Sequence, residues 1–231
     1  MSTKLTVIPG SYETHNLADR GHLVLVCDWS GSMEKYKQAM DQAFENMVHQ
    51  CTDSIGLRQS LEIAVCDFSS RVQFRDFAPP PHYQEPQPAF SGGGYTMLGA
   101  ALSTTIEMTQ QRRAMQRADG IHVVRTVCVV LSDGQASDLA ELESAKQKIG
   151  QMEDSEEIEF IPLLIKGMHL GPLEHIFDRV PIPVDAMKFD VLFAALCRSM
   201  SQHSVVAIES DALVYEMLLL EYENSDEDEH E

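Results

Sequence analysis

The chain has 231 residues, 44% of them hydrophobic, and a formal net charge of −19. This length and apolar content suffice for one domain with a substantial core, and so acidic a surface repels phosphate backbones, which argues against a nucleic-acid partner. No apolar run approaches the ~20 residues of a membrane-spanning helix, and the opening MSTKLTVIPG lacks a secretory apolar segment. We therefore expect a cytoplasmic protein with no membrane partner.

The first half of the chain alternates between strand-like and helix-like patterns. Short apolar runs predict strands, and apolar residues spaced by three and four predict helices. The expected elements, in order, are a strand at 23–27, a helix at 33–51, strands at 61–68 and 71–77, and a helix at 96–115. The two neighbouring strands are expected to pair through a short serine-containing turn.

The second half continues the alternation. The expected elements are a strand at 123–131, a helix at 139–149, a strand at 158–165, a short helix at 173–177 and a last helix at 188–200. The run at 123–131 is rich in β-branched residues, which is typical of a central parallel strand. Together these elements predict an α/β fold, with a doubly wound, mostly parallel open sheet, helices on both faces and one antiparallel edge strand.

Composition divides the chain into a short N-terminal segment over 1–19, a folded domain over 20–203 and a C-terminal extension over 204–231. The extension ends in EYENSDEDEHE, which holds seven acids and no lysine or arginine. Within the domain, residues 78–88 are too rich in proline for regular structure and are expected to form either a rigid surface connection or a rim that contacts a partner.

The cysteine pattern fits a reducing compartment. An odd number of cysteines without a secretory signal argues against a disulfide framework, and neither these residues nor the nine histidines show the clustering of a zinc site. We expect reduced thiols that act as small buried hydrophobic side chains. They are Cys27, Cys51, Cys66, Cys128 and Cys197.

Five residues with hard oxygen ligands occur in three separated motifs. Asp28, Ser30 and Ser32 lie in HLVLVCDWSGSM directly after an apolar run, and alternate residues of an extended turn can point to one side. Thr96 opens TMLGAAL, and Asp133 follows the apolar run of VCVVLSDG. Carboxylate and hydroxyl oxygens suit Mg²⁺, Mn²⁺ or Ca²⁺. In a parallel sheet the ends of both strands lie at one edge, so the sequence predicts a divalent-cation site there.

These three motifs, in this order, resemble the von Willebrand factor type A (vWA) domain with an intact metal-ion-dependent adhesion site. The resemblance covers roughly residues 20–203. In length, the chain is similar to short intracellular forms of the family, including those associated with tellurite resistance and stress responses. It implies a Rossmann-like fold in which Ser30, Ser32 and Thr96 ligate the ion, while Asp28 and Asp133 bind it directly or through water. Trp29 departs from the motif and is expected to shield the ion or contact a partner.

The resemblance also implies a function. The protein would be a binding module rather than an enzyme, in which the divalent cation accepts an Asp or Glu from a protein partner. A stress-response or defence complex is the expected setting. With only two carboxylates among the ligands, the ion is weakly neutralised and stays open to an outside acidic ligand.

Several polar residues receive simpler interpretations. Asp67, at the end of a strand, is expected to be solvated or to cap a helix. His15 and His22 are expected at the surface. The cluster of Arg112, Arg113 and Arg117 is expected to form a solvated helix face.

Two alternatives remain open at this point. A strand ending in Asp28, with Asp133 and Asp138 after a later strand, also resembles haloacid-dehalogenase-type phosphohydrolases, in which the first Asp is a nucleophile and later acids hold Mg²⁺. Ser30 stands where those enzymes carry a general acid, and no lysine motif follows. The other alternative is a structural vWA domain with a vestigial site.

Overall fold

The structure is a computed structural model that describes residues 4–10, 19–84, 90, 92–185 and 188–203. The expected C-terminal extension, most of the N-terminal segment and His15 lie outside the described residues, so the predicted domain boundaries stay predictions.

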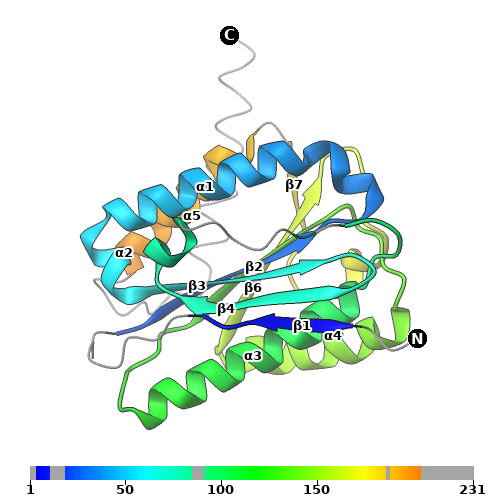
Figure 1. The fold of residues 1–231 in the computed structure, drawn as a ribbon. Coiled ribbons are helices and arrows are strands. Elements are labelled where there is room, and N and C mark those ends of the chain that lie inside the picture. Colours follow the sequence, from blue (N-terminus) through cyan, green and yellow to red (C-terminus); the bar gives the residue numbers. More distant parts are fainter. Residues whose placement is uncertain (1–3, 11–18, 85–89, 91, 186–187, 204–231) are drawn as a thin grey trace.

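Seven strands form one sheet in the order β1-β4-β3-β2-β5-β6-β7 (Figure 1). The pair β3/β4 is antiparallel and every other pair is parallel, which confirms the predicted fold class. The expected antiparallel strand is β4, but β1 lies outside it and forms the edge. The strands are β1 Leu5–Ile8, β2 Gly21–Asp28, β3 Leu61–Phe68, β4 Val72–Ala78, β5 Thr126–Ser132, β6 Ile158–Ile165 and β7 Ile182–Val184.

Helices cover both faces of the sheet. The helices α1 (Lys37–Asp53) and α5 (Phe189–His203) lie on one face, and α3 (Leu98–Ala118) and α4 (Leu139–Asp154) lie on the other (Figure 1). A short helix α2 (Ile55–Ser60) follows α1. Three 3₁₀ helices complete the fold, namely η1 Gly31–Tyr36, η2 Pro80–Gln84 and η3 Gly171–His175.

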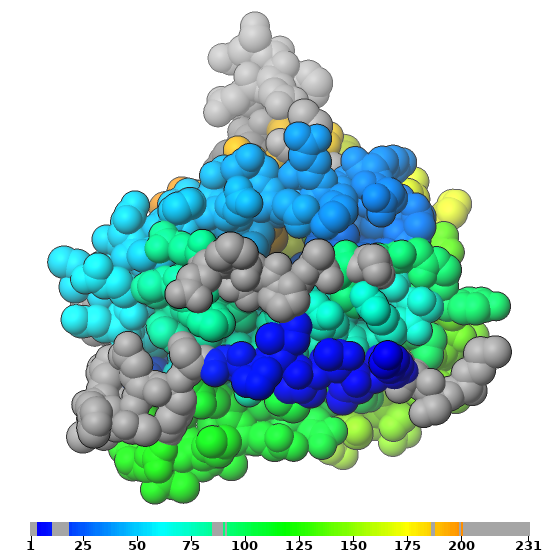
Figure 2. Space-filling model, in the orientation of Figure 1, coloured from blue at the N-terminus to red at the C-terminus, as the bar shows by residue number. Residues whose placement is uncertain are grey.

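The two-residue period of a strand divides the core into two layers. In β2, Leu23 and Leu25 pack in the cluster that contains α1 and α5, whereas Val24 and Val26 pack in the cluster that contains α3 and α4. The edge strand β1 carries exposed apolar side chains, with Leu5 48% and Val7 44% exposed. Figure 2 shows β1 lying across the front of the molecule between α1 and α3.

Most predicted elements are present, and the differences have local causes. The strands at 61–68 and 158–165 have the predicted bounds, whereas α3 begins at Leu98, so Thr96 precedes the helix. The proline-rich segment is not irregular throughout. Its residues Pro80–Gln84 form η2, and a 3₁₀ turn tolerates proline at its start. Besides η2, the elements not expected from the sequence are β1, β7 and α2. They are too short for a periodic pattern to stand out.

Three expectations of solvent exposure are wrong. His22 is fully buried, and Arg112 and Arg113 are 8% and 3% exposed. Arg112 forms a bidentate ion pair with buried Glu62. Its Nε donates to Oε2 at 2.8 Å, and its Nη2 donates to Oε1 at 2.6 Å. Only Arg117 of the predicted cluster is exposed, and it pairs with Glu157. The buried charges lie near the starts of β2 and β3. Asp28 lies at the other end of β2.

All five cysteines fall within the described part of the chain, and each is buried there without a disulfide. In the same part of the chain, no helix is long and apolar enough to cross a membrane.

Candidate metal-binding site

The ends of two neighbouring strands bring the first and third motifs together. Strand β2 pairs in parallel with β5, with Cys27 opposite Leu131. Asp28, the last residue of β2, therefore lies beside Ser132, the last residue of β5. The Ser132 hydroxyl donates a hydrogen bond to Asp28 Oδ2 at 2.9 Å. Strand order reverses around β2, so this is the switch point at which open α/β sheets bind ligands.

A tight turn after β2 gathers the hydroxyl groups. The backbone N–H of Ser30 donates to Asp28 Oδ1 at 2.8 Å, and the chain then enters η1, which holds Ser32. The Ser30 and Ser32 hydroxyl oxygens lie 3.1 Å apart, and Ser32 donates a hydrogen bond to Asp133 Oδ2. Four of the five predicted ligands thus form one connected group, although a 3₁₀ turn rather than an extended one brings them together.

Thr96 reaches the same edge of the sheet through its backbone. Its N–H donates to the Ser137 hydroxyl at 3.2 Å, its carbonyl accepts from the Ser137 N–H at 2.8 Å, and the next N–H donates to the Ser69 carbonyl at 2.8 Å. Ser137 follows β5 and Ser69 follows β3, so the threonine is held between the ends of the central strands. Among the described residues, its hydroxyl makes no hydrogen bond to the other four candidates.

The glycines before Thr96 allow this loop to approach the first motif. The Gly93 N–H donates to the Trp29 carbonyl at 3.0 Å. A Cβ on Gly92 would lie 1.7 Å from the same carbonyl oxygen, so no other residue fits there without a shift of the backbone. This contact couples the position of Thr96 to the segment that carries Asp28 and Ser30.

The site concentrates negative charge in a buried place. Asp28 is 0% exposed and Asp133 is 2% exposed. Burial, with a further contribution from the Asp133 charge, raises the pKa of Asp28 to about 6, while hydrogen bonds from Ser30 and Ser132 oppose the rise. No lysine or arginine in the described chain pairs with either carboxylate. Buried carboxylates are normally neutralised by a base or a metal ion.

The candidate site is poor in the residue types that most often gather around a metal ion. No three His, Cys, Asp or Glu residues gather at one place in the described residues. The predicted set holds only two such residues and three hydroxyls, which is an all-oxygen set suited to Mg²⁺ or Mn²⁺ rather than Zn²⁺.

Two residues near the site differ from expectation. Asp67 is 2% exposed and neither solvated nor a helix cap, because it accepts from Trp29 Nε1 at 2.7 Å and pairs with Arg75 at 2.9 Å. Trp29 is itself 8% exposed and packs in the core beside α1, so it is neither a shield over the site nor a surface contact.

Three serines outside the predicted set shape the site. Ser132 binds Asp28, and it is the Ser of the S-D-G motif, so a sequence signal for it existed. Ser137 and Ser69 hold the backbone at Thr96, and nothing in their sequence context points to this role. Asp138, the later acid of the phosphohydrolase alternative, accepts from the Gly99 and Ala100 N–H groups and so caps α3.

Comparison with known proteins identifies the family. A sequence model described as the von Willebrand factor type A domain matches residues 22–179, which include all five candidate ligands. No curated protein matches the chain.

Solved structures show the same fold at low sequence identity. Proximal thread matrix protein 1 from the mussel byssus is 17% identical with a TM-score of 0.52, over 79% of this chain and 48% of that one. The pilus adhesin SpaC from Lactobacillus rhamnosus GG is 14% identical with a TM-score of 0.56, over 83% of this chain and 30% of that one. The chain therefore spans less than half of either protein. Because the family match covers more than half of the chain, this protein belongs to the von Willebrand factor type A domain family, a family of protein-interaction modules.

Proposed function

We propose that this protein is a metal-dependent protein-binding module. In this proposal Asp28, Ser30, Ser32, Thr96 and Asp133 hold a divalent cation, Mg²⁺ or Mn²⁺ in preference to Ca²⁺. A bound ion would supply positive charge and one coordination position for a carboxylate from a partner protein. The partner's Asp or Glu would replace a water molecule there, so that binding requires both the ion and the acid.

The unmatched charge of two buried carboxylates carries this proposal. Asp28 and Asp133 lie in one hydrogen-bonded group with no basic partner, and their repulsion contributes to the raised pKa of Asp28. A cation would relieve this cost, and the adjacent hydroxyls add neutral oxygen ligands without completing the neutralisation. The ion would then keep enough positive charge to attract an external carboxylate.

The proposed setting is a cytoplasmic complex with a stress-response or defence role, as in the short forms that the sequence resembles. We propose no catalytic role. A nucleophilic Asp28 would need a general acid two residues later, where Ser30 stands, and the Asp138 carboxylate is already engaged by the backbone of α3.

Mn²⁺ offers a direct test, because water bound to this paramagnetic ion speeds the relaxation of solvent protons. We expect the relaxation rate of solvent protons to be higher with Mn²⁺ bound to the wild-type protein than with free Mn²⁺. Such an enhancement would show that the bound ion keeps an exchanging water molecule. A short peptide with one Glu should lower the enhancement, and the same peptide with Gln should not.

Ser32→Ala should weaken Mn²⁺ binding. Ser70→Ala is the matched control, since Ser70 is an exposed serine in the β3–β4 turn. Equal Mn²⁺ affinity for Ser32→Ala and wild type, or equal responses to the Glu and Gln peptides, would contradict the proposal.

A further inference from the structure

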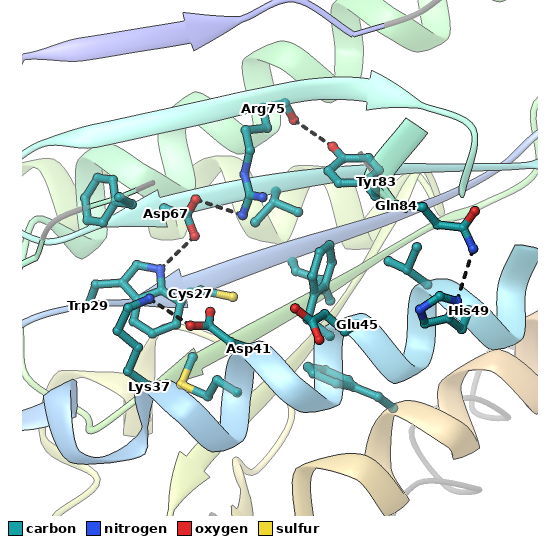
Figure 3. A pocket seen from close by; sticks show the side chains of 17 residues that line it. Cys27, Trp29, Lys37, Asp41, Glu45, His49, Asp67, Arg75, Tyr83 and Gln84 are labelled. Carbon is teal, nitrogen blue, oxygen red and sulfur yellow. Dashed lines mark hydrogen bonds and ion pairs between the residues drawn. The ribbon is translucent and has the colours of Figure 1, made fainter. Parts of the chain in front are cut away.

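A second feature is a cavity of about 550 Å³ between α1 and the strands β2, β3 and β4. Its volume is in the range of small-molecule sites, about 300–1,000 Å³. Leu25 and Val65 from the sheet and Met40 and Val48 from α1 give it an apolar interior. The lining residues come from both sides of the opening, as Figure 3 shows.

Aromatic rings form part of the wall. Phe44 of α1 meets Tyr83 of η2 edge to face, with ring centres 5.8 Å apart. Such rings bind apolar groups well, and their faces also attract cations.

The cations in the lining are already compensated. Arg75 pairs with Asp67 at 2.9 Å and lies over the rings of Phe44 and Tyr83. Burial raises the pKa of Asp67, while Arg75 and Trp29 oppose the rise by each contacting one of its carboxylate oxygens.

Lys37 likewise pairs with Asp41 at 3.0 Å, and its ammonium lies 4.3 Å from the centre of the Trp29 ring. The two charge pairs therefore cancel within the lining. His49 lies at the outer end of the lining, where its Nδ1 is 3.1 Å from the Gln84 side-chain amide nitrogen.

Glu45 is the third carboxylate of the lining, and it has no ion pair or hydrogen bond to any described residue. It projects from α1 toward the cavity, between the Lys37–Asp41 pair and His49 (Figure 3). One uncompensated negative charge beside an apolar, aromatic-walled space favours a ligand with the opposite charge.

We propose that this cavity binds a small organic amine, with its apolar body against the interior and its ammonium group at Glu45. A single lysine or arginine side chain would leave much of the volume empty, so a small molecule is the better occupant. The proposal goes beyond the metal-dependent function and does not depend on it. The cavity approaches the candidate ion site at Cys27 and Trp29, the two residues that flank Asp28.

Trp29 makes the test direct. It is the only tryptophan of the chain and it lines the cavity, so its fluorescence reports an occupant. The probes are 4-phenylbutylamine, 4-phenylbutanol and 4-phenylbutyrate, which share a body and differ in charge, titrated in buffer with EDTA. The amine should change Trp29 emission saturably and bind several-fold tighter than the alcohol, and the acid should bind most weakly. The preference should shrink in high salt.

Glu45→Gln keeps the shape of the side chain and removes its charge. It should weaken amine binding about three- to fivefold, the size expected of one partly exposed ion pair, and leave alcohol binding unchanged. Glu143→Gln, an exposed position on α4, is the control and should bind like wild type. Equal binding of amine and alcohol, or no effect of Glu45→Gln, would overturn the assignment of charge. A titration in which no probe changes Trp29 emission saturably would overturn the site itself.

Discussion

The indole N–H of Trp29 donates a hydrogen bond to Oδ1 of Asp67 at 2.7 Å, and both side chains are buried. The bond joins the turn that follows Asp28, the last residue of β2, to the end of β3, and the Asp67–Arg75 pair extends the connection to β4. Trp29, the bulky residue within the ligand motif, therefore links the end of β2 to β3 and, through Asp67, to β4.

Trp29→Phe should destabilise the protein by about 2 kcal/mol, because a hydrogen bond to a buried charged group is worth about 1.5–3 kcal/mol. Urea unfolding followed by circular dichroism measures the change. Tyr83→Phe lies in the same cavity and is the control. It removes only hydrogen bonds of 3.3 and 3.4 Å to backbone carbonyls, so its effect should be less than half as large. Equal effects would show that the indole hydrogen bond stabilises the protein no more than the weaker hydrogen bonds of Tyr83 do.

Asp28→Asn should separate metal binding from folding. In wild type, Mg²⁺ at one hundred times its Kd should add about 2.7 kcal/mol of stability, and the variant should gain none. Because the folded-state pKa of Asp28 is raised from 3.8 to about 6, its ionised form destabilises the metal-free protein above pH 6. Metal-free Asp28→Asn should then be at least as stable as wild type at pH 8. Identical Mg²⁺ responses in thermal melts would remove Asp28 from the site.

Thr96→Ala should leave the fold intact, because the hydrogen bonds that hold this residue come from its backbone. If its hydroxyl is a ligand, Mg²⁺ affinity measured by calorimetry should fall at least about tenfold, a loss seen even for residues that only support metal ligands. Thr104→Ala on α3 is the control and should bind Mg²⁺ normally. A variant that unfolds outright would instead make Thr96 mainly structural.

Glu62→Gln should destabilise the protein by about 3–5 kcal/mol, because it removes the carboxylate charge that pairs with the buried Arg112 guanidinium. Glu157→Gln, which breaks the exposed pair with Arg117, should cost less than about 1 kcal/mol.

The pH dependence of stability gives a second readout for Glu62. Burial alone would raise the pKa of Glu62, but His22 and Arg112 lower it from 4.5 to about 2. Its stabilising contribution is thus complete above pH 4.5 and is lost as the pH falls toward 2. The stability difference between wild type and Glu62→Gln should shrink over that window. A difference that stays constant would show that Glu62 is not ionised in the folded protein.

Oxidation should join Cys51 of α1 to Cys197 of α5, whose sulfur atoms lie 3.0 Å apart. The hydrogen bond from Cys51 lowers the pKa of Cys197, which favours it as the attacking thiolate. With diamide, which takes up two electrons and two protons, the two thiols form one disulfide. Peptide mass spectrometry should find this cross-link in wild type and in Cys128→Ser, but not in Cys51→Ser. Its absence from wild type would show that the helices hold the sulfurs out of bonding geometry.

The family, the fold class and the five candidate ligands were available from the sequence, because each rests on local patterns. An apolar run followed by D-x-S-x-S, or by S-D-G, places oxygen side chains at the end of a strand whatever the rest of the chain does. The alternation of strand and helix signals then implies a parallel sheet, in which those ends share one edge.

Tertiary structure alone decided how the remaining polar residues are used. Glu62 and Arg112 are 50 residues apart and look like ordinary surface charges until β3 and α3 pack together. Asp67 and Trp29 meet only because β2 and β3 lie side by side. Ser137, which follows β5, bonds to Thr96 only because the segments that follow the central strands meet at one edge of the sheet. Burial and pairing depend on contacts between distant segments, and a single sequence has no periodic signal for such contacts. Local patterns therefore specify which groups stand at the sheet edge, whereas packing determines which charges lie inside and what neutralises them.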